Sequence, residues 1–361
     1  MTTPQFHSLR VKDIRKETAT CVSVALDIPQ DLKETFAYQA GQYITFKKDM
    51  DGEELRRSYS LCSSPLEDDF RVAIKQIRGG KFSTYANKTL KVGDTLEVMP
   101  PMGNFVLKPD TAKAGHYLAF VAGSGITPVL SMIKTTLQQE PESRFTLVYG
   151  NQNFQSIIFR EAIEALKSKY LHRLQVIHIL SRERMETELN YGRISTEKCA
   201  QLFTRLIDLE SISQFLLCGP EEMIHCIKDY LIGRGVAQEK IRFELFNTST
   251  SAKQKEEYQA AHAEDAGKMC SLTIKVDDRS FDLPLAYTGE SILDAALKHG
   301  ADLPFACKGG VCCTCRAKVI EGEVEMEVNY ALEPDEVANG FVLTCQAHPK
   351  SDRVVIDFDA R

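Results

Sequence analysis

Four cysteines close to the C-terminus constrain what this chain can fold into more than any other feature. Cys307, Cys312 and Cys315 lie in one short loop, and Cys345 follows after 29 intervening residues. Cys313 stands inside the same loop, whereas the other six of the eleven cysteines are scattered singly. Disulfides are rare in reducing compartments, where cysteines crowded in this way are typical of a metal site. The sequence therefore predicts a C-terminal domain built around a metal centre.

The spacing of these cysteines indicates the kind of metal centre. Thiols separated by four and then two residues, with a distant fourth, show the plant-type [2Fe-2S] spacing. Gly309 and Gly310 lack a Cβ, so the loop can bend tightly and bring backbone N–H groups near the sulfurs. Cys313 breaks the spacing and is interpreted as a bystander. A structural zinc site is the alternative, but such sites usually show two close pairs of ligands, and this loop supplies one. The expected ligands are Cys307, Cys312, Cys315 and Cys345.

Length, composition and charge limit the remaining classes. At 361 residues the chain is too long for one ordinary core, which indicates two or three domains. Its 43% hydrophobic and 26% charged content is typical of a globular protein, and no run reaches the roughly 18 apolar residues of a membrane span. The net charge of −6 argues against a nucleic-acid partner. The N-terminus lacks the features of a secretory signal, so we expect a cytoplasmic protein with no membrane partner.

The pattern of apolar residues divides the chain into three domains and a linker. Residues 1–110 show short, regularly spaced apolar runs broken by Gly, Pro and Asp, which predict an antiparallel β-barrel. In residues 111–246 strand-like and helical patterns alternate, which predicts a doubly wound α/β domain with a parallel sheet. Residues 247–268 are polar and lack apolar periodicity, as in a linker. Residues 269–361 combine strand runs with a short helix, so we expect an α+β domain around the cysteine loop.

The individual elements can be predicted from the same patterns. The barrel strands are expected at Cys21–Ile28, Tyr43–Phe46, Arg71–Ile77 and Thr95–Val98. The strands of the middle domain are expected at Tyr117–Ala122, Phe145–Tyr149, Leu174–Leu180 and Gln214–Cys218. Its helices are expected near Pro128–Gln139, Ser156–Lys169, Thr196–Leu206 and Glu221–Arg234. In the last domain we expect a hairpin of Leu272–Val276 and Ser280–Leu283, a helix at Ser291–Lys298, and strands at Ala317–Ile320, Phe341–Thr344 and Val354–Phe358.

Two segments of the first domain are candidates for binding a flavin. In the run Arg57, Ser58, Tyr59 and Ser60, an arginine can pair with a phosphate, an aromatic ring can pack on the isoalloxazine, and a hydroxyl can donate to N5. An exposed basic strand end is the alternative for this run. The second segment contains two glycines followed by a serine that could cap a helix starting near Thr84, where a pyrophosphate would meet free N–H groups. A plain turn before a capped helix is the alternative there. The further candidates are Lys75, Gly80, Lys81, Phe82 and Ser83.

The middle domain has two candidate nicotinamide-binding segments. The first contains Gly123, Ser124, Gly125, Thr127 and Pro128; it follows the first strand of the domain and opens a helix, which is the phosphate-binding position of a doubly wound fold. It lacks the complete Rossmann fingerprint, and its proline suits a first helical turn. The second segment ends a later strand and opens another helix. Its cysteine, taken alone, is more often a buried strand thiol. The residues of this second segment are Cys218, Gly219 and Pro220.

Ser181 and Arg182 bear on the choice between NAD and NADP. They end the strand Leu174–Leu180, where an acidic residue would favour the free ribose hydroxyls of NAD. A serine and an arginine instead suit a 2′-phosphate, and Arg193 could assist them. Glu183 could alternatively hold an arginine in a surface ion pair. On balance the sequence favours NADPH over NADH.

Together these motifs resemble the ferredoxin–NADP reductase superfamily fused to a C-terminal plant-type ferredoxin. The resemblance covers essentially the whole chain and implies a β-grasp fold for the last domain and FAD as the flavin. It also assigns roles beyond the cluster ligands, including Glu244 and Phe246 as the acidic and aromatic pair that ends the reductase core. In relatives the aromatic member shields the flavin face, although core packing is the plain alternative for Phe246. The chain departs from many relatives at Ala40, where they carry proline. The resemblance implies that the residues acting at the reacting atoms are Ser60, Cys218 and Phe246.

Longer runs narrow the resemblance within this superfamily. The segments Asp51–Arg57, Ala306–Cys312 and Asn329–Glu336 resemble the reductase subunits of phenylacetyl-CoA epoxidases, which are multicomponent di-iron oxygenases of phenylacetate catabolism. This implies a path of electrons from NADPH through FAD and [2Fe-2S] to an oxygenase component, which binds the acyl-CoA itself. Reductases of Rieske oxygenases, steroid hydroxylases or hybrid-cluster proteins are alternatives of the same class. A redox sensor with an inert reductase half is an alternative of a different class.

Overall fold

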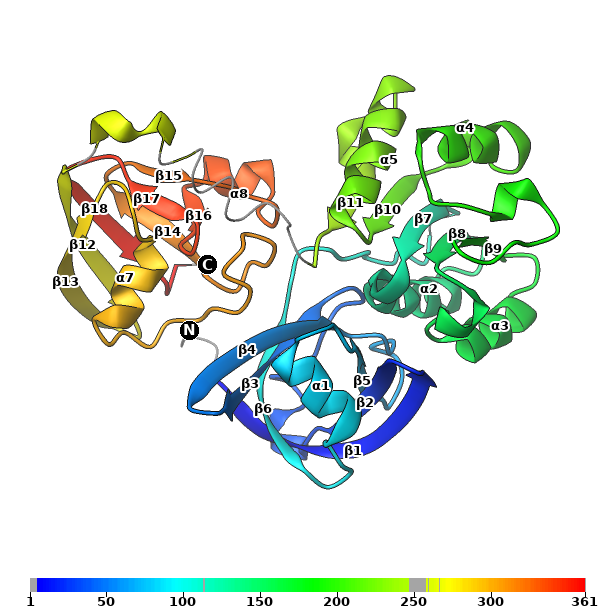
Figure 1. The fold of residues 1–361 in the computed structure, drawn as a ribbon, viewed down its shortest axis with the longest axis horizontal. Coiled ribbons are helices and arrows are strands. Elements are labelled where there is room, and N and C mark those ends of the chain that lie inside the picture. The colour runs from blue at the N-terminus through cyan, green and yellow to red at the C-terminus, as the bar shows by residue number, and fades with distance from the viewer. Residues whose placement is uncertain (1–4, 113, 247–257, 259, 266, 361) are drawn as a thin grey trace.

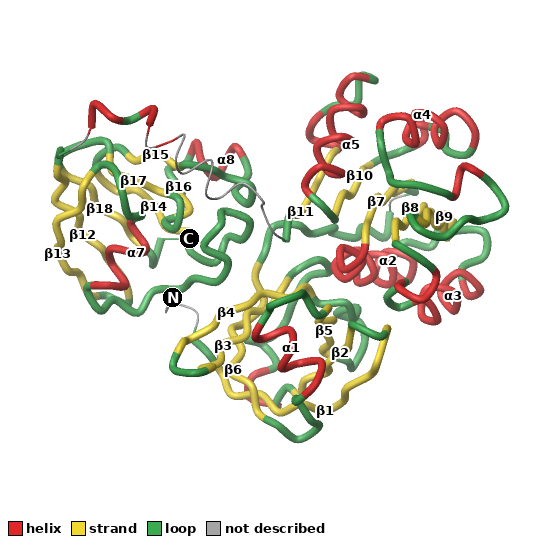
Figure 2. The backbone as a smooth tube through the Cα atoms, viewed as in Figure 1, coloured by secondary structure: helices red, strands yellow, loops and turns green. Residues whose placement is uncertain are grey.

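The structure of the chain, a computed structural model, describes residues 5–112, 114–246, 258, 260–265 and 267–360. These residues form three bodies, each built on its own sheet, that meet near the middle of the molecule (Figure 1). Most of the predicted linker, residues 247–257, 259 and 266, lies outside the described residues. The tube in Figure 2 shows strands prevailing in the first and last bodies and helices flanking the sheet of the second.

The N-terminal body is an antiparallel sheet of six strands in the order β4-β3-β6-β1-β2-β5. A bridge between Leu61 and Val72 joins the end of the β4 segment to β5, so the two edges of the sheet meet as in a barrel. Helix α1, Lys81–Lys88, lies against the strands (Figure 1). The strands are β1 His7–Thr18, β2 Cys21–Asp27, β3 Tyr43–Met50, β4 Glu53–Ser60, β5 Phe70–Lys75 and β6 Thr95–Met102.

Two features of this body differ from the expectation. Strand β1 was not predicted. Leu9 and Val11 are its fully buried residues, and charged side chains dominate the rest of the strand, so no apolar run marks it in the sequence. Helix α1 begins at Lys81 rather than near Thr84, so Ser83 lies inside its first turn and is not the capping residue. The Ser83 Oγ instead accepts a hydrogen bond from the Ile77 N–H at 3.2 Å, which ties the helix to the preceding turn.

The middle body is a five-stranded parallel sheet in the order β11-β10-β7-β8-β9. Helices α2 and α3 pack on one face and α4 and α5 on the other, as their contributions to two separate apolar clusters show. This confirms the doubly wound α/β prediction. The strands are β7 His116–Ala122, β8 Arg144–Asn151, β9 Leu174–Leu180, β10 Gln214–Cys218 and β11 Ile241–Glu244, and the helices are α2 Ile126–Gln139, α3 Arg160–Lys169, α4 Thr196–Arg205 and α5 Glu221–Gly233.

Helix α3 starts four residues later than predicted, for a local reason. Asn153 and Ser156 form a capping box around a separate 3-10 turn, Phe154–Ser156. Phe159 then adopts a left-handed conformation with φ of 59°, which a continuous helix cannot accommodate. The apolar periodicity of Ser156–Lys169 did not reveal this break.

The order of the parallel strands places a topological switch point in the middle of the sheet. From β7 the chain proceeds to β8 and β9 on one side, and then returns to β10 and β11 on the other side. Ligands of doubly wound sheets bind outside the carboxyl ends of the strands at this point. The segments that follow β7 and β10 begin at Gly123 and Gly219, which are two of the predicted nicotinamide-binding residues.

The C-terminal body combines a five-stranded mixed sheet, ordered β13-β12-β18-β14-β16, with a two-stranded sheet of β15 and β17. Ser291 caps helix α7 by accepting a hydrogen bond from the Asp294 N–H at 3.2 Å. The strands are β12 Met269–Val276, β13 Arg279–Ala286, β14 Arg316–Glu321, β15 Val324–Met326, β16 Phe341–Leu343, β17 Ala347–Pro349 and β18 Arg353–Asp357, and the helices are α7 Ile292–Lys298 and α8 Pro334–Ala338.

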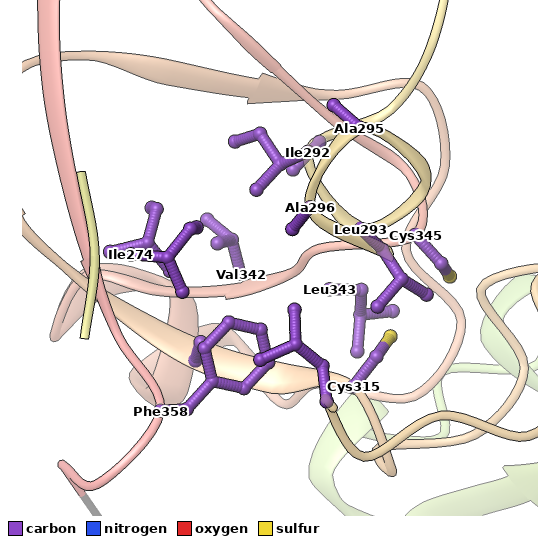
Figure 3. Close-up of a cluster of buried hydrophobic side chains, with 14 of the residues drawn as sticks. Ile274, Ile292, Leu293, Ala295, Ala296, Cys315, Val342, Leu343, Cys345 and Phe358 are labelled. Carbon is purple, nitrogen blue, oxygen red and sulfur yellow. The ribbon is translucent and has the colours of Figure 1, made fainter. Parts of the chain in front are cut away.

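The core of this body also supports the cysteines. Figure 3 shows Leu293 of α7 close to Leu343, with the side chains of Cys315 and Cys345 beside them. These two cysteines are buried to 1% and 6% exposure. The apolar core therefore holds the segments around Cys315 and Cys345, on which two of the four thiols lie.

An apolar interface joins the first two bodies. Phe105 and Leu107, from the segment after β6, share one buried cluster with Met132 and Ile133 of α2. The Ser131 hydroxyl adds a hydrogen bond to the Ser63 carbonyl at 2.5 Å. Burial of this kind fixes the barrel against the carboxyl edge of the parallel sheet. No helix within the described part of the chain is both long and apolar enough to cross a membrane.

Replacing Ile227 by Ala should measure how much the core of the middle body contributes to stability. Ile227 lies on α5 and is fully buried. Its truncation should lower the free energy of unfolding by about 2–5 kcal/mol, because the lost side chain leaves a cavity. Ile232→Ala on the same helix is the control, since Ile232 is 43% exposed and should change stability by about 0.5 kcal/mol or less. Urea titration followed by circular dichroism would compare the two variants. Equal losses of unfolding free energy would contradict the placement of Ile227 in the core.

Candidate active site and iron–sulfur centre

A cavity of about 510 Å³ lies where the three bodies meet. Strands β3, β4 and β5 line one side of it, the residues after β7 and β11 line another, and the cysteine loop closes a third. Many of the predicted site residues come together on this cavity although they are distant in sequence. They are Arg57, Ser58, Tyr59, Ser60, Lys75, Ser83, Ser124, Thr127, Glu244, Phe246, Cys307 and Cys312.

Strand β4 carries the candidate flavin-binding side chains, and successive side chains along it point to opposite faces of the sheet. Tyr59 packs its ring near Phe46 and Phe82 of the barrel core, with centroids 6.0 and 5.8 Å away. The Ser58 hydroxyl is held by the Thr45 hydroxyl at 3.0 Å. Arg57 is exposed, and one of its guanidinium nitrogens donates to the backbone carbonyl of the preceding residue at 2.7 Å. An exposed, backbone-tethered guanidinium at the rim of the cavity suits a phosphate.

The glycine loop before α1 offers backbone N–H groups at a helix N-terminus. Gly80 is the N-cap of α1, and no side chain caps the helix there. A Cβ on Gly80 would lie 2.5 Å from Ile77 Cγ1 and 2.6 Å from Ser83 Oγ, so a larger residue would displace these two side chains. Lys81 pairs with Glu53 at 2.6 Å, and the ring of Phe82 lies in the barrel core. Any contact of Phe82 with a cofactor would therefore come from its backbone.

The segment after β7 approaches β10 very closely. Residues Gly123–Gly125 form a 3-10 turn that leads directly into α2, and Gly123 has a φ of 56°. A Cβ on Gly125 would lie 2.1 Å from the carbonyl oxygen of Cys218, so only glycine allows the two strand ends to meet. The Thr127 hydroxyl donates to the Ser124 carbonyl at 3.0 Å, which secures the turn. Pro128 is the third residue of α2.

The end of β10 is equally tight. A Cβ on Gly219 would lie 2.6 Å from Met223 Cε and 3.2 Å from the Ala122 nitrogen. Cys218 is fully buried, and burial raises the pKa of its thiol well above the ordinary value, with Glu244 adding to the rise. Pro220 occupies the N-cap position of α5, without a side-chain capping hydrogen bond. The structure thus brings both predicted nicotinamide segments to the switch point of the sheet.

Glu244 and Ser60 link two bodies at the cavity. Glu244 ends β11, next to Cys218 of β10 in the parallel ladder. Its carboxyl accepts a hydrogen bond from the Ser60 hydroxyl of β4 at 3.3 Å. Burial raises the pKa of Glu244 to about 8, against the smaller opposing effect of the Ser60 hydrogen bond. Phe246 lines the same cavity two residues later. Burial therefore favours the neutral form of this carboxyl.

The residues predicted to select the nucleotide lie at the carboxyl end of β9. The backbone N–H groups of Ser181 and Arg182 donate to the carbonyls of Asn151 and Gln152 at 2.9 and 2.8 Å. The side chains of Arg182 and Arg193 are exposed. The Glu183 carboxylate accepts from the Phe154 N–H at 2.7 Å, so a backbone group occupies one oxygen of this carboxylate.

The four predicted cluster ligands lie together. The thiols of Cys307 and Cys312 are 3.1 Å apart, and Cys345 contacts both Cys307 and Cys315. The contact with Cys307, followed by burial, raises the pKa of the Cys312 thiol well above its ordinary value. A cationic iron–sulfur core would favour the deprotonated thiols that such crowding otherwise opposes.

The backbone around these thiols also suits a [2Fe-2S] group. The Gly309 N–H donates to Cys307 Sγ at 3.3 Å, as the sequence predicted for an N–H donor in this loop. Gly310 has a φ of 72°, and a Cβ there would lie 2.9 Å from Val328. Within the described ranges no three His, Cys, Asp or Glu side chains are arranged to hold a single ion. A [2Fe-2S] group has two irons, so its four thiolates need not share one centre.

Sequence reasoning missed residues that join the barrel to the last body. Arg56 and Tyr43 both reach from barrel strands to the cysteine-bearing domain. Strand alternation alone would have shown that Arg56 faces away from Arg57. What it faces could not be predicted without knowing how the bodies pack. Cys313, interpreted as a bystander, is buried beside the Tyr43 hydroxyl at 3.6 Å.

Three family descriptions match successive parts of the chain. Residues 9–107 match the oxidoreductase FAD-binding domain, 120–229 the oxidoreductase NAD-binding domain, and 275–350 the 2Fe-2S iron-sulfur cluster binding domain. The chain belongs to the ferredoxin–NADP reductase-like oxidoreductases that carry a C-terminal 2Fe-2S ferredoxin domain. The predictions of FAD, a nicotinamide dinucleotide and a [2Fe-2S] cluster as cofactors are thereby confirmed. The individual binding residues stay predictions that the geometry supports.

Relatives of known function have the same domain organisation. One of the subunits of 1,2-phenylacetyl-CoA epoxidase from Escherichia coli is 47% identical over 99% of this chain and 98% of its own length. The ferredoxin reductase component of 3-ketosteroid-9-alpha-monooxygenase from Rhodococcus rhodochrous is 33% identical, with coverages of 97% and 96%. Among solved structures, phthalate dioxygenase reductase superimposes with a TM-score of 0.57 at 22% identity, covering 98% of both chains. That likeness confirms the three-part fold.

Removing one predicted ligand should separate the ligands from the bystander. Cys345→Ala should abolish the visible and electron paramagnetic resonance signals of the [2Fe-2S] cluster, because a thiolate ligand is lost and alanine offers no replacement donor. Cys313→Ala is the matched control and should retain both signals and the iron content, since Cys313 lies outside the ligand spacing. Loss of the cluster in the control, or its retention in Cys345→Ala, would contradict the ligand assignment.

The raised pKa of Glu244 predicts a pH dependence of stability. Between the ordinary pKa range of a carboxyl group and about pH 8, the folded protein keeps the carboxyl proton of Glu244. The unfolded chain has already released that proton in the same pH range. The contribution of Glu244 to stability therefore falls as the pH rises through that window. Glu244→Gln cannot ionise, so its Tm relative to wild type should increase from about pH 5 to about pH 9. Glu161→Gln, at an exposed position of α3, should show a constant difference, and a constant difference for Glu244→Gln would refute the raised pKa.

Proposed function

We propose that the chain is the reductase component of a phenylacetyl-CoA epoxidase, which passes electrons from NADPH through FAD and a [2Fe-2S] cluster to a di-iron oxygenase component. The observation that carries this proposal is the shared cavity. It joins candidate flavin residues on β4, candidate nicotinamide residues after β7, and the cluster ligands Cys307 and Cys312. One cavity lined by all three sets provides a continuous internal route for electrons.

The residues of the chain act mainly by positioning. When bound, the flavin accepts a hydride from the nicotinamide and releases its two electrons singly. Gly123 and Gly125 shape the turn that would hold the nucleotide at the switch point, and Arg57 would neutralise a flavin phosphate. The Ser60 hydroxyl and Glu244, whose pKa is raised by burial, would offer a hydrogen-bonded pair at the cavity wall that could hold a proton. By positioning the two cofactors in one cavity, these residues would supply most of the rate enhancement through proximity and orientation.

The partner and the compartment follow from separate arguments. Identity of 47% across nearly the whole chain supports the same oxygenase partner as that of the Escherichia coli relative. Residues 269–361 contain 16 Asp and Glu against 9 Lys and Arg, so this domain would approach a basic partner surface favourably. The seven cysteines outside the proposed cluster ligands are free thiols, which supports action in the reducing cytoplasm.

NADPH is proposed as the nucleotide because of the residues around the end of β9. Ser181 lies there together with the exposed arginines Arg182 and Arg193, and Glu183 accepts a backbone hydrogen bond. A 2′-phosphate would gain two guanidinium partners at this position.

An anaerobic titration tests the proposed function directly. The purified protein would be mixed with NADPH or NADH and followed by absorbance and electron paramagnetic resonance. Flavin bleaching followed by the signal of a reduced [2Fe-2S] cluster supports the internal path. Absence of bleaching with both nucleotides would overturn the reductase proposal. Turnover of phenylacetyl-CoA with the purified epoxidase oxygenase, but not with a ketosteroid oxygenase, would support the partner, and the reverse result would replace it.

Arg182→Ala should test the choice of nucleotide. Loss of a guanidinium that pairs with the 2′-phosphate should raise KM for NADPH about tenfold or more, with little change for NADH. Arg205→Ala, at an exposed position at the end of α4, is the control and should change neither constant. Steady-state reduction of ferricyanide measures both. Equal effects of Arg182→Ala on the two nucleotides would contradict the role in selecting NADPH.

The acidity of the last domain predicts a salt dependence of electron delivery. If charge steers this domain to the oxygenase, the second-order rate of oxygenase reduction should fall as ionic strength rises, because screening weakens the attraction. Flavin bleaching by NADPH, measured in the same salt series, controls for effects on the nucleotide site. A flat response of oxygenase reduction would rule out electrostatic steering.

A further inference from the structure

Tyr43 connects the strand that pairs with the candidate flavin-binding strand β4 to the cluster loop. It lies on β3, directly opposite Ser60 of β4 in the antiparallel ladder. Its side chain is 5% exposed and belongs to the apolar core of the ferredoxin domain rather than to that of the barrel. The Tyr43 hydroxyl is 3.0 Å from the Thr314 Oγ1 and 3.6 Å from the Cys313 sulfur. Thr314 immediately precedes the cluster ligand Cys315.

Arg56 makes a second connection of the same kind. Its guanidinium lies 4.0 Å over the ring of Phe305, which is two residues before the ligand Cys307. It also donates to the Leu303 carbonyl at 3.1 Å and pairs with Glu54 at 2.8 Å. The side chain is 7% exposed, so the charge is buried between the two bodies with partners on both sides. A stacked, multiply bonded arginine is a specific contact that lysine cannot reproduce.

The two contacts hold opposite ends of the cluster loop. Tyr43 reaches the segment before Cys315, and Arg56 reaches the segment before Cys307. Both start from the strand pair that carries Arg57 and Ser60. The pair therefore sets the position of the cluster ligands relative to the flavin-binding strands directly, without passing through the nucleotide domain.

We propose that Tyr43 and Arg56 are positioning residues that dock the cluster loop against the flavin cavity and thereby set the rate at which electrons cross from flavin to cluster. This inference rests on the proposed function. In total, one NAD(P)H and two oxidised clusters give one NAD(P)+, two reduced clusters and one proton, so each hydride requires two single-electron crossings. Electron transfer between cofactors weakens steeply with their separation. Tyr43 and Arg56 also line the cavity, but their polar contacts are with Thr314, Leu303 and Glu54 rather than with the candidate nicotinamide residues. A small loss of docking should therefore slow this step and leave hydride transfer unchanged.

Stopped-flow reduction of the full-length holoprotein tests the proposal. Tyr43→Phe and Arg56→Gln would be mixed anaerobically with NADPH, and flavin bleaching and cluster reduction would be recorded separately. Cluster reduction should slow roughly fivefold in each variant, the size expected when one buried hydrogen bond across an interface is lost. Flavin bleaching, flavin content and ferricyanide reduction should match the wild type. Tyr170→Phe at the end of α3 and Arg10→Gln on β1 are controls and should leave both steps unchanged.

A double-mutant cycle separates the direct contact from a general structural effect. Thr314→Val removes the partner hydroxyl of Tyr43, and Thr314→Ser keeps it. If the contact acts as proposed, Thr314→Val should add little to the slowing of cluster reduction that Tyr43→Phe causes. Thr314→Ser, as a single variant, should retain the wild-type rate of cluster reduction. The spectrum of the dithionite-reduced cluster must be the same in all variants, which excludes damage to the cluster.

The outcomes distinguish this inference from the proposed function. Wild-type protein whose flavin bleaches without any cluster reduction would overturn both. Cluster reduction at the wild-type rate in Tyr43→Phe and Arg56→Gln would overturn the docking role alone. Slower flavin bleaching, or additive effects of Tyr43→Phe and Thr314→Val, would likewise overturn it, because the residues would then act on the flavin site or through separate contacts.

Discussion

Electrons move between cofactors over short distances only, so three domains with separate cores must converge on one cavity. The parallel sheet supplies its switch point, the barrel supplies β4, and the ferredoxin domain supplies the cysteine loop. The apolar contact between α2 and the segment after β6 fixes the first two relative to each other. The ferredoxin domain is reached from the barrel by Tyr43 and Arg56, and its residues Val311 and Tyr330 pack against an apolar cluster of the middle body. The internal electron path depends on these contacts.

Strand alternation lets one pair of strands serve two cofactors. On β4, Arg57 is exposed at the cavity rim while its neighbour Arg56 is buried against the cluster loop. Across the ladder, Ser60 contacts Glu244 and its partner Tyr43 contacts Thr314. Alternation separates Arg56 from Arg57, whereas Ser60 and Tyr43 are ladder partners that share one face and reach different bodies of the molecule. A shift of register by one residue would turn these side chains to the opposite face of the sheet and disrupt both sites.

Some elements could be predicted and others could not, for identifiable reasons. The β7, β9 and β10 strands and helices α2 and α5 have uninterrupted apolar patterns, and their predicted bounds lie close to the observed ones. Strand β1 was missed because charged residues mask its two buried positions. Strands β15 and β17 and helix α8 are three to five residues long, too short for a periodic pattern to show. The expected cap at Ser83 was wrong because helix α1 starts three residues earlier.

The sequence by itself determined the cofactors and the order of the domains. Cysteine spacing, the two glycine segments and the Arg-x-Tyr-Ser run are local patterns whose chemistry depends on neighbours within a few residues. Only the tertiary structure decided that Glu244 lies half-buried beside Ser60, that Gly125 meets the carbonyl of Cys218, and that Arg56 and Tyr43 reach the cluster loop. Burial and contact between distant segments arise from packing of the whole chain, and local sequence patterns carry no information about that packing.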